Sequence, residues 1–257
     1  MDIKIIVATH KKNEMPASDL YLPVHVGKEG KEDVGYVGDN TGDNISIKNP
    51  NYSELTAIYW AWKNLDVDFI GLVHYRRYFA ANKKKGKGFK NLLTKDEAEK
   101  LLSETDVILP KKRNYFIESL YSHYSNTHDE RHLIETKNTI DEIFPDYSES
   151  FTRVLQRKKG HMFNMFIMKK EVMNSYCAWL FPILFDLETK IDYKNLSPYD
   201  ARLFGRISEL LLDVWIDKNS IKYKEIPCIH LGKIDWTRKI FSFIFAKFSK
   251  KKYSKSF

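Results

Sequence analysis

Residues 53–64 read SELTAIYWAWKN, and residues 69–79 read FIGLVHYRRYF. The first segment has the apolar spacing of a short helix, and the second begins with an apolar run that predicts a buried strand. The strand is followed by a cluster of polar and charged residues: His74, Tyr75, Arg76 and Arg77. Open α/β sheets bind their ligands just outside the carboxyl ends of their strands. This order of helix, strand and polar cluster therefore predicts an α/β fold with a ligand site at the strand end.

Arg76 and Arg77 favour a phosphate-bearing ligand at this site. Guanidinium groups form paired hydrogen bonds with phosphate oxygens and remain charged at any physiological pH. The same cluster also fits a structural role, in which a buried histidine and two arginines hold neighbouring loops together. The residue pattern alone leaves both interpretations open.

The remaining sequence alternates between strand-like and helix-like segments. Apolar runs predict strands at residues 3–8, 106–110 and 163–168. Helical spacing predicts helices at residues 94–103, 170–187 and 199–217. Residues 115–160 are expected to be mainly helical, whereas residues 20–50, rich in Gly, Asp and Asn, are expected to be largely loop. Ser53 is expected to cap the first helix, and the alternation as a whole is typical of an α/β domain.

The composition indicates a folded intracellular protein. Of 257 residues, 43% are hydrophobic and 14% aromatic, which is enough for a sizeable core. The two cysteines, Cys177 and Cys228, lack the spacing of a zinc site or a disulfide framework. The first ten residues are expected to form a strand rather than a signal peptide, and no apolar run is long enough to cross a membrane. We therefore expect a cytoplasmic location.

The positive charge is concentrated in the last part of the sequence. The net charge is +8, but residues 237–257 hold seven basic residues and no acidic one, which leaves about +1 for residues 1–236. A nearly neutral body argues against a broad nucleic-acid-binding face. We therefore divide the chain into a main domain at residues 1–236 and a basic tail at residues 237–257.

The basic tail has the spacing of a helix with an apolar face. The residues on that face are Phe241, Ile244, Phe245 and Phe248. A basic helix with such a face is typical of a segment that lies on an anionic membrane surface, which is the interpretation we prefer. The alternative is a helix that packs on the core of its own protein.

Two further segments contain candidates for chemistry. Arg202 and Glu209 are seven residues apart and would lie on nearly the same helix face, where Glu209 could act as a general base or form an ion pair. Asp200 is a second carboxylate near the start of that helix. The loop candidates are His10, Lys11, Asp39, Asn40 and Asn44. These loop residues could contact a nucleotide or sugar hydroxyls, or could serve only to shape turns.

Seven blocks spread over residues 3–217 resemble a known bacterial family. The blocks are IVATHK (6–11), GDNTGDNIS (38–46), ELTAIYWAWKN (54–64), DFIGLVHYRRYF (68–79), FNMFIMKK (163–170), YCAWLFPILFDLE (176–188) and RLFGRISELLLDVW (202–215). They resemble the cytoplasmic sugar transferases of capsule, exopolysaccharide and O-antigen synthesis, a family with galactofuranosyltransferase-like members. The resemblance implies a single glycosyltransferase-A-like, Rossmann-related α/β domain with a mixed central sheet.

The resemblance also implies a role for each candidate residue. An inverting enzyme would move a hexose, such as galactofuranose, from a UDP-sugar to a lipid-linked saccharide at the inner face of the plasma membrane. The donor would be bound by Thr9, His10, Lys11, Asp39, Asn40, Asn44, His74, Tyr75, Arg76 and Arg77. Asn164 and Arg202 would lie near the sugar or acceptor, and Glu209, or in second place Asp200, would deprotonate the acceptor.

The polar cluster at residues 74–77 takes the place where many such folds carry a metal-binding D-x-D pair. Fixed cations can neutralise a leaving diphosphate, so we expect weak or absent metal dependence and assign no metal ligands. The alternative is a metal ion that binds through His74 and a distant carboxylate. Two other classes remain open from the sequence. The chain could be a non-catalytic scaffold that binds polyanions or membranes through its tail, or an enzyme that transfers or cleaves phosphate.

Overall fold

The computed structural model describes residues 1–80 and 88–231, so the predicted tail helix lies outside the described residues. The strands are β1 (Ile3–Thr9), β2 (Tyr21–His25), β3 (Val37–Gly38), β4 (Phe69–His74), β5 (Arg77–Phe79), β6 (Val107–Pro110), β7 (Arg113–Asn114), β8 (Lys159–Gly160), β9 (Phe166–Lys169), β10 (Lys224–Ile226) and β11 (Cys228–His230). The α-helices are α1 (Asn49–Tyr52), α2 (Leu55–Asn64), α3 (Lys95–Leu102), α4 (Leu120–Thr127), α5 (Arg131–Ile143), α6 (Ser148–Leu155), α7 (Lys170–Lys190) and α8 (Leu203–Lys218).

A mixed sheet forms the centre of the molecule, with the strand order β10-β6-β9-β4-β1-β2-β3. β1 pairs in parallel with both β2 and β4, whereas β9 runs antiparallel between β4 and β6. The carboxyl ends of β1 and β4 therefore lie at the same edge as the chain entering β9. β5 pairs with the end of β4 and with β11 at this edge.

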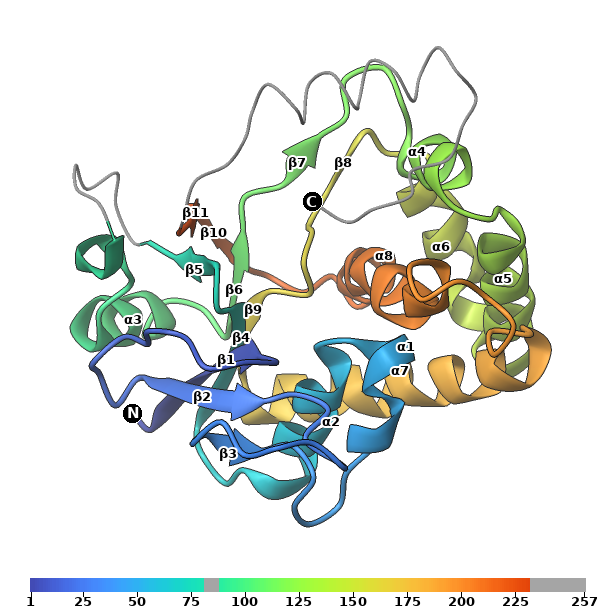
Figure 1. Ribbon diagram of the computed structural model, residues 1–257. Coiled ribbons are helices and arrows are strands. Elements are labelled where there is room, and N and C mark those ends of the chain that lie inside the picture. Colours follow the sequence, from blue (N-terminus) through green and yellow to red (C-terminus); the bar gives the residue numbers. More distant parts are fainter. Residues whose placement is uncertain (81–87, 232–257) are drawn as a thin grey trace.

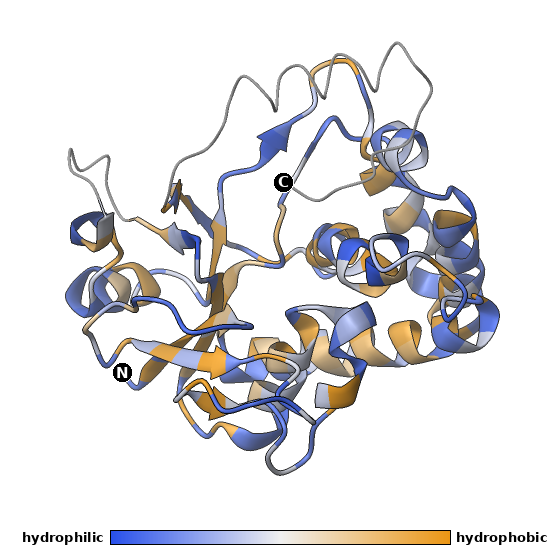
Figure 2. Ribbon diagram, in the orientation of Figure 1, coloured by the Kyte–Doolittle hydropathy of each residue, from blue (hydrophilic) through white to orange (hydrophobic). Residues whose placement is uncertain are grey.

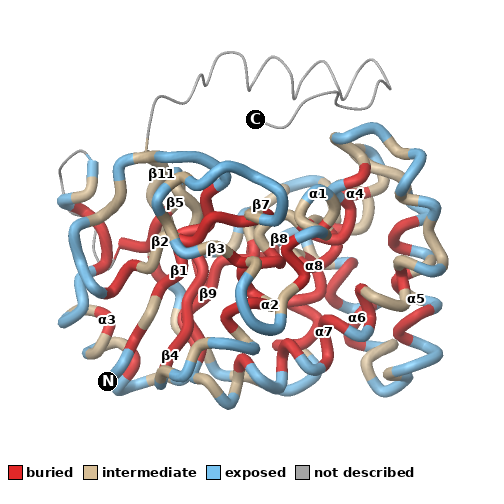
Figure 3. Tube along the Cα trace, turned by 60° about the horizontal axis from the view of Figure 1, so that its bottom comes forward, coloured by how far each residue is buried: buried red, intermediate tan, exposed pale blue. Residues whose placement is uncertain are grey.

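Two hydrophobic clusters cover the two faces of the sheet, because side chains alternate along each strand. On β4, Ile70 and Leu72 join the helices α2, α7 and α8, and Phe69 and Val73 join the cluster that contains α3. Figure 2 shows the apolar central strands, and Figure 3 shows that buried residues concentrate in them and in the helices beside them. The sheet is thus a rigid layer between two cores, and its edge is a stable place for a site.

The sequence-based elements are confirmed in large part. α2 and β4 fall where the spacing predicts them, and residues 115–160 are mainly helical. β9 begins at Phe166 and not at residue 163, because Phe163 and Asn164 adopt left-handed backbone conformations. The predicted start of α3 is a capping box, in which the Thr94 hydroxyl accepts from the Glu97 amide and the Glu97 side chain accepts from the Thr94 amide. The mixed α/β architecture is the one that the resemblance implies.

One prediction about the first third of the chain is confirmed but incomplete, and another is wrong. Residues 20–50 are largely loop, as predicted, but they also contain the short strands β2 and β3, because the buried Leu20 and Val24 allow this polar segment to pair in parallel beside β1. Ser53 does not cap α2. It adopts a left-handed φ of 53° at the break between α1 and α2, and its hydroxyl accepts a hydrogen bond from Arg202 Nε at 3.1 Å.

Among the described residues, no helix has both the length and the apolar character needed to cross a membrane.

Candidate active site

The strand cluster forms one wall of a cavity. His74 ends β4, and Arg77 begins β5 directly opposite it in a tight hairpin. His74 Nε2 lies 2.7 Å from the carbonyl oxygen of Phe163, in the segment that leads into β9. The guanidinium of Arg77 stacks 4.3 Å from the centre of the Phe163 ring. The two polar side chains are thereby held by a segment almost ninety residues away in the sequence.

The opposite wall comes from α8, from the 3-10 turn before it (Asp200–Arg202), and from the α1–α2 junction. The cavity has a volume of about 200 Å³ and is lined by Ser53, Glu54, His74, Arg77, Phe163, Tyr199, Arg202, Gly205, Arg206 and Glu209. Of the residues predicted from the sequence, it brings together His74, Arg77, Arg202 and Glu209. Three cations and two carboxylates thus share one small space at the edge of the sheet.

The side chain of Asn164 connects residues of the cavity wall to one another. Phe163 and Asn164 both have left-handed backbone conformations, with φ values of 74° and 53°. The buried Asn164 amide nitrogen donates to Glu54 Oε1 at 2.7 Å and to the Gly205 carbonyl at 3.0 Å. Its amide oxygen accepts from the Ser208 hydroxyl at 2.6 Å. Asn164 therefore orients Glu54 and ties the β9 entrance to α8.

Burial raises the pKa of Glu209 to about 7, and the neighbouring carboxylate of Glu54 adds to this rise. A backbone hydrogen bond from Phe163 and the charges of Arg77 and Arg206 act in the opposite direction. Glu209 can therefore take up and release a proton near neutral pH. That property suits a general base.

A second group of cations adjoins the cavity at the end of β1. His10 packs edge-on against the Tyr75 ring with 5.5 Å between ring centres. Lys11 Nζ lies 5.7 Å and the Arg76 guanidinium 5.0 Å from the centre of that ring. Partial burial lowers the pKa of His10, and the nearby charges of Lys11, Lys31, Arg76 and Arg202 lower it further. Because Arg202 lines the cavity and its charge acts on His10, this group of cations lies within electrostatic reach of the cavity.

The loop candidates serve the local backbone in this structure. Asp39 is fully buried, and its two carboxylate oxygens accept from the amides of Gly27 and Lys28 and from the hydroxyls of Ser46 and Thr56. The Asn44 side chain forms a turn, in which its oxygen accepts from the Ser46 amide.

Asn40 and Thr9 are the remaining candidates in these two loops. The Asn40 amide group donates weakly to Glu29 at 3.4 Å. The buried Thr9 hydroxyl donates to the Lys11 carbonyl and so shapes the loop after β1. Neither residue lines the cavity described above.

Asp200 does not line the cavity, although its turn contributes Arg202 to the wall. Its carboxylate accepts from the Ser197 hydroxyl at 2.7 Å, at the turn that precedes α8. Asp200 shares a helical segment with Glu209 but does not line the same space.

The sequence reasoning missed Glu54, Phe163, Tyr199 and Arg206. Arg206 could have been found, because it lies four residues after Arg202 and three before Glu209 on a helical face. Glu54 and Phe163 carry no such local signal, because they reach the site only through the packing of distant segments.

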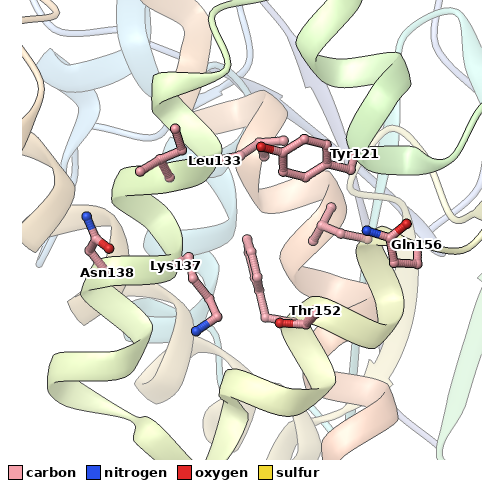
Figure 4. Close-up of a pocket in the computed structure, with 9 residues that line it drawn as sticks. Tyr121, Leu133, Lys137, Asn138, Thr152 and Gln156 are labelled. Atoms are coloured by element: carbon pink, nitrogen blue, oxygen red, sulfur yellow. The ribbon is translucent and has the colours of Figure 1, made fainter.

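A second cavity of about 230 Å³ lies between α4, α5 and α6. Figure 4 shows its lining residues on neighbouring helices, among them Tyr121, Leu133 and Thr152. Most of its surface is apolar, and its one cation, Lys137, pairs with Asp141. We therefore place the candidate active site in the smaller, polar cavity. Within residues 1–80 and 88–231, no three His, Cys, Asp or Glu side chains are grouped to hold a metal ion.

The mixed α/β fold, taken with its likeness to a solved glycosyltransferase, is that of a glycosyltransferase-A-like domain. The chain is similar to a solved structure, that of the WbbM bifunctional glycosyltransferase in its apo form, with a TM-score of 0.84 and 30% sequence identity. The alignment covers 91% of this chain but 46% of WbbM, so the chain spans about half the length of that protein. No curated protein matches the sequence.

Residues 4–220 match the family described as Domain of unknown function (DUF4422). The chain belongs to this family.

Proposed function

We propose that this chain is a glycosyltransferase that uses a nucleotide-sugar donor. The observation that carries the proposal is the polar cavity, in which Glu209, with its pKa near 7, faces Arg77 and Arg206 at the edge of the sheet. The likeness to a bifunctional glycosyltransferase supports the same class. A base and fixed cations around one space are the two elements that sugar transfer from a diphosphate requires.

In the proposed reaction, Glu209 removes the proton from an acceptor hydroxyl. The hydroxyl oxygen then forms a bond to the anomeric carbon of the donor sugar as the bond from that carbon to the diphosphate oxygen breaks. The configuration at the carbon inverts. Arg77, with Arg76 nearby, neutralises the charge that develops on the leaving diphosphate, and Arg202 lies near the sugar or acceptor. The proton stays on Glu209 until solvent removes it.

We assign the nucleotide end of the donor to the group formed by His10, Lys11, Tyr75 and Arg76, with Thr9 shaping its loop. Asn40 and Asn44 are candidates for contacts with sugar or ribose hydroxyls, and Asp39 holds the loop on which they lie. Asn164 acts on the sugar or acceptor through Glu54, which it orients. Asp200 remains the second candidate for the base.

The donor we propose is a UDP-hexose, with UDP-galactofuranose first, and the acceptor is a lipid-linked saccharide of capsule, exopolysaccharide or O-antigen synthesis. The basic tail at residues 237–257 would hold the protein on the inner face of the plasma membrane. We also propose weak or absent metal dependence, because fixed arginines can neutralise the charge of a leaving diphosphate without a metal ion.

Titration with UDP, followed by thermal unfolding, tests the proposal. A ligand at 100 times its Kd stabilises a protein by about 2.7 kcal/mol, which raises Tm by several degrees. We expect this rise with UDP, with or without Mg²⁺ or Mn²⁺, and its loss in Arg77→Gln. The absence of any rise across these metal conditions would contradict the transferase.

Other ligands separate the alternatives. An equal rise with inorganic phosphate would favour a phosphate-processing enzyme, and a rise only with a polyanion such as heparin would favour a scaffold. A screen of nucleotide sugars with detection of the product by mass spectrometry then identifies the donor.

A further inference from the structure

The loop after β7 exposes two large apolar side chains at its apex. Phe116 is 75% exposed and Ile117 is 68% exposed. Figure 2 shows this apolar apex beside the hydrophilic β7. Isolated exposed apolar residues are common, but two adjacent ones of this size at a loop apex need an explanation.

The backbone holds this apex in place. Phe116 has a left-handed φ of 58°, a conformation that is unfavourable for a bulky aromatic residue. Its amide donates to Asn114 Oδ1 at 2.9 Å, and the Ile117 amide donates to the Tyr115 carbonyl at 2.7 Å. Tyr115 is in turn held by a bond from its amide to the Lys158 carbonyl at 2.8 Å. The protein therefore displays the apolar pair on a fixed base.

Exposed cations lie on the two paired segments at the base of the apolar pair. β7 pairs with β8, which places Lys158 and Lys159 beside Asn114 and Tyr115. The exposed cations on these two segments are Lys111, Arg113, Lys158 and Lys159. Within the described residues, none of the four forms an ion pair. We call the apolar pair with these four cations the basic–apolar tip.

We propose that the basic–apolar tip is a membrane contact, in which Phe116 and Ile117 enter the interface of a bilayer and the four cations bind anionic headgroups. An apolar insertion flanked by lysine and arginine matches the two properties of such a surface, an apolar interior and a negative face. A protein partner would need a shaped, complementary surface. A bilayer needs only the apolar pair and the positive charge.

The tip is also connected to the candidate active site. The hydroxyl of Tyr115, next to Phe116, lies 3.0 Å from Sδ of Met162. Met162 directly precedes Phe163, which lines the cavity. Burial raises the pKa of Tyr115, and the charge of Glu209 adds to this rise, so the ring lies within electrostatic reach of the proposed base. A membrane contact here would hold the cavity close to a lipid-linked acceptor. This last point rests on the proposed function, whereas membrane binding itself does not.

Vesicle binding of the full chain tests the proposal. Phe116→Ser combined with Ile117→Ser should weaken binding to vesicles of phosphatidylcholine and phosphatidylglycerol by about tenfold or more. Lys158→Glu combined with Lys159→Glu should weaken vesicle binding by a similar factor and should make that binding less dependent on salt. The matched control is Ile47→Ser, because Ile47 is 76% exposed elsewhere and its neighbour Lys48 is paired with Glu188. Unchanged binding in the Phe116/Ile117 variant would overturn the proposal.

A local probe makes the result independent of other membrane contacts. In a Cys228→Ser background, a polarity-sensitive fluorophore is attached to Ile117→Cys or to Ile47→Cys. We expect a blue shift on adding anionic vesicles at position 117 and none at position 47. No shift at position 117 would refute the insertion, even if the protein still binds vesicles. UDP-induced stabilisation should be the same in all these variants, so a failure of the membrane proposal and a failure of the transferase proposal give different results.

Discussion

Glu209 owes its unusual pKa to burial and to a neighbouring carboxylate that the sequence does not place beside it. Burial of the carboxyl and the nearby charge of Glu54 both favour its protonated form, and they outweigh the backbone hydrogen bond from Phe163. Below pH 7 the protonated carboxyl cannot accept a proton from an acceptor, so turnover should fall as the pH is lowered through about 7. Glu209→Gln should lower kcat by about 10²–10⁴ fold while UDP binding is retained.

The same variant should be more stable than the native protein at pH 8. Folding raises the pKa of this carboxyl from an ordinary 4.5 to about 7. The free energy of unfolding therefore decreases as the pH rises from about 4.5 to about 7, because the carboxyl must ionise in an unfavourable site. Glutamine removes that cost. A higher Tm together with lost turnover would exclude unfolding as the cause, whereas full turnover would move the base to another residue.

Glu54→Gln tests the coupling between the two carboxylates. The amide keeps the acceptor for Asn164 but removes the negative charge, so the pKa of Glu209 should fall. The acid limb of the profile of kcat/KM against pH should then move to lower pH. The control is Glu171→Gln, because Glu171 is 74% exposed at the start of α7. An acid limb that stays in place in Glu54→Gln would show that Glu209 is not the group being titrated.

At the scale of elements, Asp39 connects β3, the loop after β2 and α2. Its carboxylate accepts from two backbone amides and two hydroxyls, and its removal would leave these buried donors without an acceptor. Asp39→Ala should therefore lower the free energy of unfolding by about 3 kcal/mol or more, measured by urea denaturation. The control is the exposed Asp19. Asp19→Ala should change the free energy of unfolding by less than about 0.5 kcal/mol. A stable Asp39→Ala protein that no longer binds UDP would instead assign Asp39 to the donor.

α8 is the element that the sequence describes best. Its apolar positions face the core, and the spacing of Arg202 and Glu209 correctly predicts that both reach one space. The wall opposite them could not be predicted, because it is built by the α1–α2 break at Ser53 and by two left-handed residues before β9. Such conformations are set by tertiary contacts and not by local preference.

At the scale of the whole molecule, charge separates the body from the tail. The body carries about +1 and the last 21 residues carry +7, so deletion of residues 238–257 should weaken binding to anionic vesicles strongly at low salt. UDP should raise the Tm of the shortened protein as much as that of the full chain, because all the residues that line the cavity precede residue 238. Loss of both properties would contradict a separate tail, and unchanged vesicle binding would assign the membrane contact to the body alone.

The sequence by itself determined the alternation of strands and helices, the polar cluster at the end of β4 and the uneven distribution of charge. These properties depend on residues close together in the chain, where periodicity and composition act directly. The tertiary structure alone decided that β2 lies beside β1, that Phe163 closes the cavity over His74 and Arg77, and that Glu54 faces Glu209. The physical reason is that burial and charge coupling arise between residues up to 155 positions apart, once the sheet has brought their segments to one edge.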